Sequence, residues 1–413
     1  MAGLLAENNN FRLFYLARLS SIAGSQITYV AVPVLALRMY ESAVTAAFVT
    51  SSQYVATLLL GPLAGALSDR HDQRRNLIVA DAVRLVLFAV LAALIGLTNH
   101  VPVVVFCLII MANSAFASLF SSSSMPFFAA IVRKEDYSRA VSQSDVRDYS
   151  IAMIGPVVGA ALFAVNNWLP FVLDAASYLI SMVLILRIDT AKTRAVERAP
   201  SEGSILALAK DGARFVVTHR VLSPAVALNA LQSLVLSAVV FLLLAKAAGG
   251  DPVLPGLLLS MQALGGLIGS LLIMRLFGIL GGFKLLILQN FVWASTLLLG
   301  AVLMHYFGVI AGLFVLLFVW IPVPSAQFAF GNYVNFSVKG SMRGRTTAVS
   351  QVVASIFALA GPVIGGLVAD GQHYVAGLLG LGAVTLLGGI VNWKRLWRID
   401  SSDTEIPDES VAK

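Results

Sequence analysis

The chain has 413 residues, of which 58% are hydrophobic and 12% are charged, and its mean hydropathy is +0.87. An ordinary soluble domain carries roughly 25% charged residues, so the composition excludes a typical soluble enzyme and a disordered chain. The single cysteine, Cys107, excludes a disulfide scaffold. The apolar residues gather in runs of about 20 or more, which is the length that crosses a bilayer as a helix. The composition therefore predicts an all-α integral membrane protein.

Twelve apolar segments follow one another along the chain. They lie near 12–38, 46–67, 77–97, 102–131, 141–165, 169–188, 221–246, 253–274, 284–304, 309–335, 346–369 and 373–393. We expect each to be a helix, because an open backbone in hydrocarbon leaves unpaired N–H and C=O groups. The fourth and tenth segments are long, and Pro126 in one and Pro322 with Pro324 in the other predict breaks or kinks.

Lysine and arginine are distributed unevenly between the connections. If the N-terminus is cytoplasmic, most of the 28 basic residues fall on the cytoplasmic side, and Arg38 and Lys246 lie on the outer side. Basic residues accumulate in cytoplasmic loops, so the pattern predicts a multi-pass protein of the cell membrane with both termini in the cytoplasm. The net charge of +7 then belongs to the inner membrane surface, and we expect no nucleic-acid partner.

The two halves of the sequence resemble each other. Gly-Pro-Val-Val-Gly at 155–159 parallels Gly-Pro-Val-Ile-Gly at 361–365, and Ala-Val-Ser-Gln at 140–143 recurs at 348–351. Parallel repeats of six helices, here about 205 residues apart, are typical of two-lobed transporters that work by alternating access. The sequence thus predicts two pseudo-symmetric six-helix lobes with a linker and a tail: an N-terminal lobe (1–188), a cytoplasmic linker (189–220), a C-terminal lobe (221–393) and an acidic cytoplasmic tail (394–413).

The second part of the linker carries apolar residues at helical spacing: Ile205, Leu208, Ala209, Gly212, Phe215 and Val216. We expect an amphipathic helix on the inner membrane surface. A helix packed against the cytoplasmic ends of the spans fits the same pattern.

Glycine pairs four residues apart recur in four spans. Small residues at this spacing let helix backbones approach closely. We interpret the pairs as the seam between the lobes, where helices slide or rock, and static packing within each lobe is the alternative. The glycines are Gly61, Gly65, Gly155, Gly159, Gly265, Gly269, Gly361 and Gly365.

Ionisable residues inside spans gather in the first half of the chain. A charge in the bilayer is costly unless it is paired, so each is a functional candidate. The spacing predicts a salt-bridge layer that closes the inner side of the first lobe, and proton exchange by one of its carboxylates is the alternative. The layer comprises Arg18, Asp81, Arg84, Asp145, Arg147 and Asp148, whereas the spans of the second half offer Gln232, Gln262, Gln289, Asn290, Gln327 and Asn332.

Asp174 is placed differently, because it lies near the outer end of the sixth span. By depth its closest cation is Arg38. A carboxylate in this position could load a proton from outside, so we interpret Asp174 as the candidate for proton coupling. A structural ion pair with Arg38 and a solvated position at the outer lip are the alternatives.

The connection between the second and third spans carries a motif. Gly65-Ala-Leu67-Ser-Asp69-Arg70-His-Asp72-Gln-Arg74-Arg75 resembles the loop motif G-x-L-a-D-r-x-G-r-k of the major facilitator superfamily, with Asp72 in place of the second glycine. The form D-R-x-D-x-R-R, followed by Asp81 and Arg84, resembles the branch that contains macrolide efflux proteins and enterobactin exporters. The stretches Asn10 to Phe14 and Asp174 to Tyr178 resemble the same branch.

The resemblance implies a conformational latch in this loop. By resemblance, Asp69 faces the inner end of the eleventh span, near Thr346 and Thr347, and stabilises the outward-facing state. Arg70, Arg74 and Arg75 form a charge network around it. Ser25 stands where relatives often carry an acidic residue, which argues against a proton role for the first span.

Together with the spans and the buried charges, the resemblance implies a secondary exporter of an amphiphilic small molecule, such as a drug, natural product or siderophore-like compound, driven by proton antiport. It contains no nucleotide-binding, hydrolase or metal-site motif, so we expect a monomeric non-enzyme without cofactor or metal. A lipid or lysolipid flippase is the alternative, and the buried charges and the latch argue against a non-transporting scaffold. We expect the cavity between the lobes to be lined by Gln53, Tyr54, Gln232, Gln262, Trp293, Gln327 and Tyr333.

Overall fold

The computed structural model describes residues 7–189, 205–280, 282–338 and 340–396, and within these ranges the regular secondary structure is entirely helical. The chain divides into two compact units. The first comprises residues 1–200 with 244–260, and the second comprises 201–243 with 261–413. The prediction of an all-α membrane protein is confirmed.

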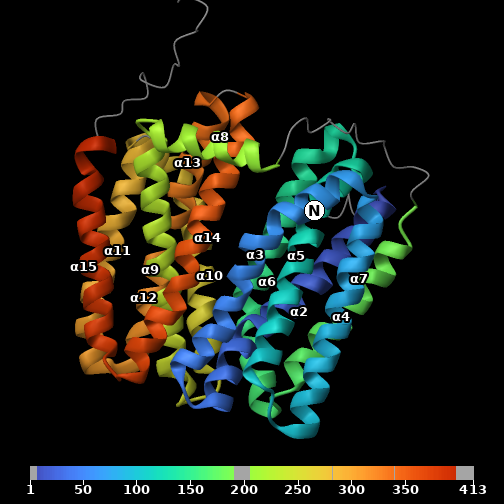
Figure 1. The fold of residues 1–413 in the computed structure, drawn as a ribbon, viewed down its shortest axis with the longest axis horizontal. Helices are drawn as coiled ribbons and strands as arrows, with labels where there is room; N and C mark the ends of the chain where they lie inside the picture. The colour runs from blue at the N-terminus through green and yellow to red at the C-terminus, as the bar shows by residue number, and fades with distance from the viewer. Residues whose placement is uncertain (1–6, 190–204, 281, 339, 397–413) are drawn as a thin grey trace, which may run out of the picture. The chain divides into compact units, whose positions relative to one another are not determined.

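The first unit is a bundle of long helices (Figure 1). They are α2 (Asn9–Tyr40), α3 (Ala43–Arg70), α4 (Gln73–Thr98), α5 (Val103–Ile131), α6 (Tyr137–Val165) and α7 (Leu169–Leu186), with a 3-10 turn η1 (Lys134–Asp136) before α6. Within the bundle α2 packs against α6 and α7, and α4 packs against α5 and α7.

The second half of the chain forms the remaining helices. They are α8 (Ile205–Thr218), α9 (Leu222–Ala248), α10 (Leu254–Leu280), α11 (Gly282–Phe307), η3 (Gly308–Ile310), α12 (Ala311–Trp320), α13 (Val323–Ser337), α14 (Gly340–Asp370) and α15 (Tyr374–Leu396). The last turn of α9 and the start of α10 group with the first unit, where Gly256 packs closely on Ala160 of α6.

Eleven stretches of the described chain are long and apolar enough to cross a bilayer. One of them, 284–335, has 52 residues. At about 1.5 Å per residue it is more than twice the roughly 30 Å of a hydrocarbon core, so it must cross twice. The turn between the two crossings is η3, where Gly308 adopts a φ of +59°. This arrangement agrees with the twelve predicted spans.

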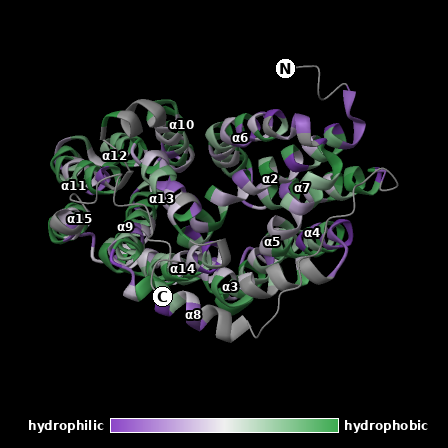
Figure 2. Cartoon of the chain, turned by 90° about the horizontal axis from the view of Figure 1, so that it is seen from above, coloured by the Kyte–Doolittle hydropathy of each residue, from purple (hydrophilic) through white to green (hydrophobic). Residues whose placement is uncertain are grey.

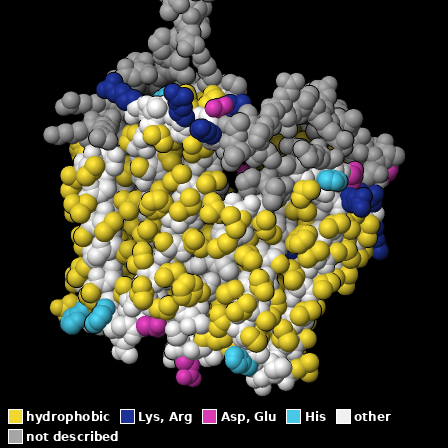
Figure 3. All heavy atoms as spheres, viewed as in Figure 1, with side chains coloured by type: hydrophobic (Ala, Val, Ile, Leu, Met, Phe, Trp, Pro, Cys, Tyr) yellow, Lys and Arg dark blue, Asp and Glu magenta, His cyan; other side chains and the backbone are white. Residues whose placement is uncertain are grey.

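The surface of the helices suits a lipid environment. Large apolar side chains are exposed along the spans, such as Leu97 at 84% and Leu271 at 76%. Figure 3 shows hydrophobic side chains covering the long sides of the helices. In the second unit, Lys and Arg on the face shown gather at the end that carries α8, which is the end predicted to be cytoplasmic.

The two expected proline breaks have different outcomes. The tenth span is interrupted at Pro322, between α12 and α13, as predicted. The expected break at Pro126 is wrong, because α5 runs through it without interruption. Pro126 cannot donate to the carbonyl of Ser122, but the Ser68 hydroxyl of α3 donates to that oxygen at 3.1 Å. The hydroxyl satisfies the acceptor that proline leaves open, so the helix can continue in hydrocarbon.

Three helices of the first unit begin at side-chain caps. Asn8, Ser42 and Asp72 accept hydrogen bonds from the backbone N–H groups three residues ahead, at the starts of α2, α3 and α4. The carboxylate of Asp72 accepts from Arg75 N at 2.8 Å. The residue that departs from the family loop motif is therefore an N-cap, which satisfies a free N–H group of the first turn.

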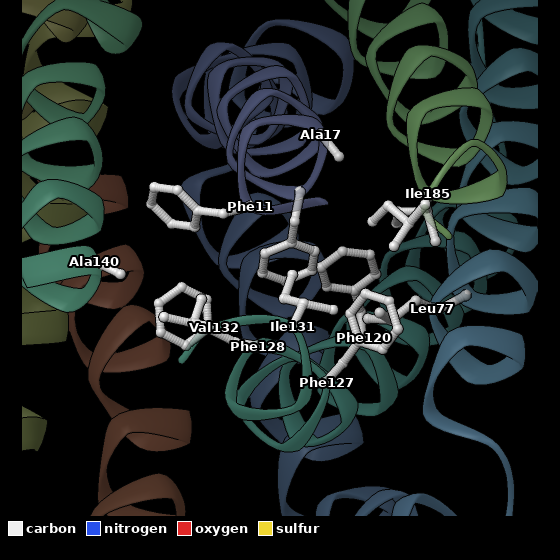
Figure 4. Packing of buried hydrophobic residues seen from close by; sticks show 13 residues of the cluster. Phe11, Ala17, Leu77, Phe120, Phe127, Phe128, Ile131, Val132, Ala140 and Ile185 are labelled. Atoms are coloured by element: carbon white, nitrogen blue, oxygen red, sulfur yellow. The ribbon is translucent and has the colours of Figure 1, made fainter. Parts of the chain in front are cut away.

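The interior of the first unit is filled by aromatic and aliphatic side chains near one end of the bundle (Figure 4). Phe11 and Phe14 of α2 pack on Phe127 and Phe128 of α5, with ring centroids 5.5 to 6.1 Å apart. Lipid tails are as apolar as these side chains, so close van der Waals contact holds the helices together here.

The glycine pairs permit close helix contacts inside each unit. Gly155 and Gly159 of α6 face Gln26 and Ile27 of α2. In the second unit, α10 packs on α12 and the following turn at Gly265 and Gly269, and α14 packs on α9 at Gly361 and Gly365. Among the described residues, no atom of another helix lies within 4 Å of a Cβ built on Gly61, and the surroundings of Gly65 lie outside the described residues. These contacts show that the described glycines of α6, α10 and α14 serve close packing within each unit.

The linker helix α8 packs against the second unit (Figures 1 and 2). A Cβ on Gly212 would lie 3.0 Å from Arg345 Cβ of α14, and Arg345 Nη1 lies 3.8 Å from the Asp211 carboxylate. Val216 is 3% exposed within the apolar core of this unit. The described part of the helix therefore follows the packed alternative, and residues 190–204 lie outside the described residues.

Gly361→Ala tests whether the glycines serve packing. A Cβ there would overlap Ser237 Oγ and Leu234 O of α9, so we expect a loss of about 1–3 kcal/mol in unfolding free energy. Unfolding in mixed detergent micelles measures it. The matched control is Gly61→Ala, which meets no neighbouring atom and should leave stability unchanged or slightly raised. Equal stability of the two variants would contradict the packing role.

Candidate functional site

A buried polar cluster lies where α2, α4 and α7 meet in the first unit. Its carboxylate is Asp174 of α7, which is 0% exposed. Asp174 accepts hydrogen bonds from Thr28 Oγ1 at 2.6 Å and from Tyr178 and Ser177 at 3.2 Å each. Gly24 permits this contact, because a Cβ there would overlap Asp174 Oδ1 and lie 2.8 Å from Ser177 Cβ. α2 can approach α7 closely only because position 24 has no side chain.

Arg84 of α4 is the cation of this cluster. It donates to Tyr178 Oη at 2.6 Å, to Ser25 Oγ at 3.2 Å and to Asn113 Oδ1 at 3.2 Å. Its guanidinium carbon lies 4.0 Å from the centre of the Tyr178 ring. Tyr178 bonds to both Arg84 and Asp174, so one tyrosine hydroxyl connects the arginine to the carboxylate.

A second carboxylate, Asp81, faces the same arginine. Asp81 Oδ1 lies 3.9 Å from Arg84 Nη1, one helical turn along α4. Asp81 is 0% exposed, and among the described residues the hydroxyl of Ser181 lies beside its carboxylate without reaching good hydrogen-bond geometry. Two enclosed carboxylates thus share one guanidinium, and a carboxylate with so few partners in hydrocarbon marks a functional position.

The expected proximity of Asp174 to Arg38 is wrong. Arg38 instead lies over the ring of Phe163, with its guanidinium carbon 5.3 Å from the ring centre. Counting residues from the helix end gives the depth of Asp174, but it does not give the direction of the side chain. α7 turns Asp174 toward α2 and α4, so its cation is Arg84, connected through Tyr178.

Four of the six residues predicted to form one inner charge layer form two ion pairs, Asp81 with Arg84 and Arg147 with Asp148. Arg147 pairs with its neighbour Asp148 at 2.7 Å and donates to the Tyr15 carbonyl of α2 at 3.2 Å. Asp145 is exposed. Arg18 lies over the ring of Phe120 at 5.4 Å and is also within electrostatic range of Asp81, Arg84, Arg147 and Asp148. The layer prediction is therefore correct for Arg18 and the two ion pairs near it, and the pair of Asp81 and Arg84 also belongs to the buried cluster with Asp174.

One arginine of the loop motif has a defined partner. Arg74 donates to the carbonyls of Ile185 and Leu186 at 3.3 and 2.5 Å, at the C-terminal end of α7. A cation there satisfies unpaired carbonyls and complements the helix dipole. Arg75 is exposed. The surroundings of Gly65, Asp69 and Arg70, and hence the expected contact of Asp69 with the eleventh span, lie outside the described residues.

The second unit contains a cavity of about 550 Å³ between α9, α11, α13 and α14. Three of the residues expected to line the cavity between the lobes line this cavity within the second unit: Gln232, Trp293 and Gln327. Gln262 and Tyr333 are not part of its wall, and Gln53 and Tyr54 lie on α3 in the first unit. Tyr333 is instead a core residue whose ring lies 6.1 Å from the ring of His219.

Sequence reasoning missed several residues of both sites. In the first unit it did not place Thr28, Ser25 and Asn113 beside the charges, although Ser177 and Tyr178 belong to a stretch quoted for the family resemblance. In the second unit it assigned no cavity role to Gln289 of α11. These residues could be recognised as polar side chains that face one another on neighbouring helices. Recognising them requires the rotation of each helix about its axis, which the spacing of residues in the sequence does not give.

A double-mutant cycle tests the buried ion pair. Arg84→Gln removes the cation that Asp81 and Asp174 share, which leaves Arg18 as the cation near Asp81, and we expect a loss of about 3–5 kcal/mol in unfolding free energy. Asp81→Asn in the same chain should recover part of this loss, because one unpaired carboxylate is removed. The control is the pair Arg133 and Asp136, which has the same spacing and lies 2.8 Å apart but is partly exposed. Its coupling should be about 0.2–1 kcal/mol. Additive effects at 81 and 84 would contradict the pairing.

Comparison with solved structures shows the same fold in known transporters. The structure aligns with the nucleoside transporter NupG at 10% identity and a TM-score of 0.73, covering 95% of this chain and 100% of that chain. It aligns with a bacterial homologue of the iron transporter ferroportin, in an inward-facing state, at 18% identity and a TM-score of 0.74, covering 94% and 99%. A POT family transporter in complex with a thioalcohol-conjugated peptide aligns at 11% identity and 0.73, covering 94% and 96%.

Sequence comparison gives the family. No curated protein matches the chain. A family model described as transmembrane secretion effector matches residues 5–411, which is almost the whole chain. Together with the fold, this match confirms the superfamily to which the loop motif pointed. The chain belongs to the transmembrane secretion effector family and is a multi-pass membrane transporter of the major facilitator type.

Proposed function

We propose that the protein is a proton-coupled exporter of an amphiphilic small molecule, related to the macrolide-efflux and enterobactin-exporter branch. It acts by alternating access in the cytoplasmic membrane, with both termini inside. The family description names secretion, which supports outward transport. The solved neighbours are named for nucleoside, iron and peptide cargoes, so their fold is compatible with very different substrates.

The observation that carries the proposal is the buried cluster of Asp174, Arg84 and Tyr178. Export against a gradient needs an energy source, and the sequence has no nucleotide-binding motif. Asp174 is enclosed by hydroxyl groups of α2 and α7 and connected to Arg84 of α4. A proton on Asp174 would remove the negative charge that these three helices share, and so would change their packing.

Asp81 gives the cluster a second state. With Asp174 ionised, Arg84 interacts with two carboxylates. It reaches Asp174 through the hydroxyl of Tyr178, and its Nη1 lies 3.9 Å from Asp81 Oδ1. With Asp174 protonated, Asp81 is the remaining anion beside Arg84. Arg84 then moves toward Asp81 and weakens its bond to Tyr178. A ligand such as a proton shifts a conformational equilibrium only through such a difference in contacts between states.

The described spans of the second unit support this assignment. Their ionisable side chains lie near the ends of the helices, as with Lys284, Arg343, Arg345 and Asp370. The carboxylates that are enclosed at the level of the spans are Asp81 and Asp174, both in the first unit. We therefore place proton coupling in the first unit. The loop motif, with Asp69, Arg70 and Arg75 beside the helix-capping Arg74, serves as the conformational latch.

Asp174→Asn tests the coupling. Asparagine can still accept from Thr28 but cannot exchange a proton, so we expect ΔpH-driven transport to be abolished while exchange down a gradient persists. The measurement is uptake of a fluorescent amphiphilic dye into inside-out proteoliposomes, with and without an imposed ΔpH. Asp136→Asn, which removes a carboxylate outside the spans, is the control and should retain the parental dependence on ΔpH. If Asp174→Asn also retains that dependence, Asp174 is not the proton carrier.

A further inference from the structure

We infer that the cavity inside the second unit is a binding site for an uncharged molecule that combines a carboxamide-like group with an apolar ring. The inference rests on the proposed function in one respect, namely that this ligand is the transported molecule. The site itself is defined by the residues of four helices of a single unit: α9, α11, α13 and α14.

The size of the cavity suits a small organic ligand. The cavity volume of about 550 Å³ lies within the range of about 300–1,000 Å³ that is usual for drug-sized ligands. Its wall contains apolar side chains such as Leu236, Ala326 and Phe330 together with many amides. Six amide side chains line it: Asn229, Gln232, Gln289, Gln327, Asn335 and Gln351.

The amides differ in how deeply they lie. Gln327, Asn335 and Gln351 are exposed, whereas Gln232 is 6% and Gln289 is 3% exposed. Exposed amides can bond to water when no ligand is present. Gln232 and Gln289 are buried and cannot bond to water as readily. A bound ligand therefore changes their hydrogen bonding more than that of the exposed amides.

Gln232 and Gln289 each have an unused hydrogen-bonding atom. Gln232 Nε2 and Gln289 Oε1 are buried and have no partner within the described part of the chain, and a ligand in the cavity reaches them when the terminal amide group turns toward it. A buried donor or acceptor without a partner is costly, and a ligand that supplies both an acceptor and a donor removes that cost. A primary amide, lactam or imide has this combination. Because a glutamine amide presents donors and acceptors whichever way it is turned, the match does not depend on its orientation.

A third amide of the wall, Asn229, differs from the two buried glutamines because it has a partner in the protein. Asn229 also lines the cavity, but its Nδ2 donates to Ser350 Oγ at 3.3 Å. Asn229 is therefore already held by the protein, and the free hydrogen-bonding capacity of the buried wall belongs to Gln232 and Gln289.

The wall carries no formal charge. None of the described residues that line the cavity is Asp, Glu, Lys, Arg or His. An ion that leaves water for a site without a countercharge loses more solvation free energy than amide dipoles return, so the site discriminates against anions and cations. Neutral ligands lose much less.

Trp293 provides a fixed apolar surface. It is 1% exposed, and its indole Nε1 donates to Val319 O at 2.5 Å, which holds the ring in place. With its N–H engaged by the backbone, the part of the indole that borders the cavity is apolar, and an apolar or aromatic ring of the ligand can pack against it. Hydrogen bonds to the two glutamines and a ring near Trp293 together define the ligand class.

Three probes of nearly the same size test the class by equilibrium dialysis against the full-length protein in detergent. They are N-acetylphenylalaninamide, which is uncharged, N-acetylphenylalanine, which is an anion, and phenylalaninamide, which is a cation. We expect the uncharged probe to bind at least about tenfold more tightly than either ion. Gln232→Leu and Gln289→Leu should each weaken its binding about tenfold or more, because a ligand group is left unpaired.

The control is Asn392→Leu, which removes an amide of the same unit that bonds to Gly388 O of its own helix and is not part of the cavity wall. It should bind as the parent does. The inference is overturned if an ion binds as well as the uncharged probe, if no probe binds, or if both glutamine variants bind like the parent. Dialysis uses no gradient, so failure of proton coupling at Asp174 leaves this result unaffected, and the reverse also holds.

Discussion

The structure depends on how a guanidinium is accommodated inside the bilayer. Arg84 lies within α4, is 6% exposed, and is surrounded by hydrogen-bond acceptors from α2, α5 and α7. A charge in hydrocarbon needs such partners, so these helices cannot rotate or separate without leaving it unsatisfied. The same requirement brings Asp81 and Asp174 to one arginine. The interaction that orders the first unit is therefore also the interaction that a single proton can alter.

The two units meet the problem of polar groups in the membrane in different ways. α4 and α11 are the third spans of their repeats. In its first half α4 carries Asp81 and Arg84, whereas the first half of α11 carries Gln289 and Asn290. Charges must be paired permanently because leaving them unpaired costs too much, but an amide can remain without a partner at a moderate cost. A unit built on amides can thus keep hydrogen-bonding groups free for a ligand, which a unit built on charges cannot.

Sequence reasoning predicted the features that depend on spacing along one chain segment. It gave the spans, the break at Pro322, and the pairing of Asp81 with Arg84, which are one helical turn apart. It could not give the partner of Asp174, because that depends on the rotation of α7 and on the close approach of α2 at Gly24. It also expected a break at Pro126, where a serine from another helix bonds to the free carbonyl. Each of these errors involves a contact between helices that is not encoded in the spacing of either helix.

The repeat explains why the packing is shared while the chemistry is not. The Gly-Pro-Val-Val-Gly stretch packs α6 on α2, and its counterpart Gly-Pro-Val-Ile-Gly packs α14 on α9, so the same close contact recurs in both units. That contact uses backbone and small side chains, and it leaves the polar positions of the adjoining helices free to diverge. In α2 those positions, Ser25 and Thr28, bond to the charged cluster, whereas in α9 Gln232 lines the cavity. A duplicated scaffold can therefore hold a proton site in one half and a ligand site in the other, because neither site is part of the contact that the duplication preserves.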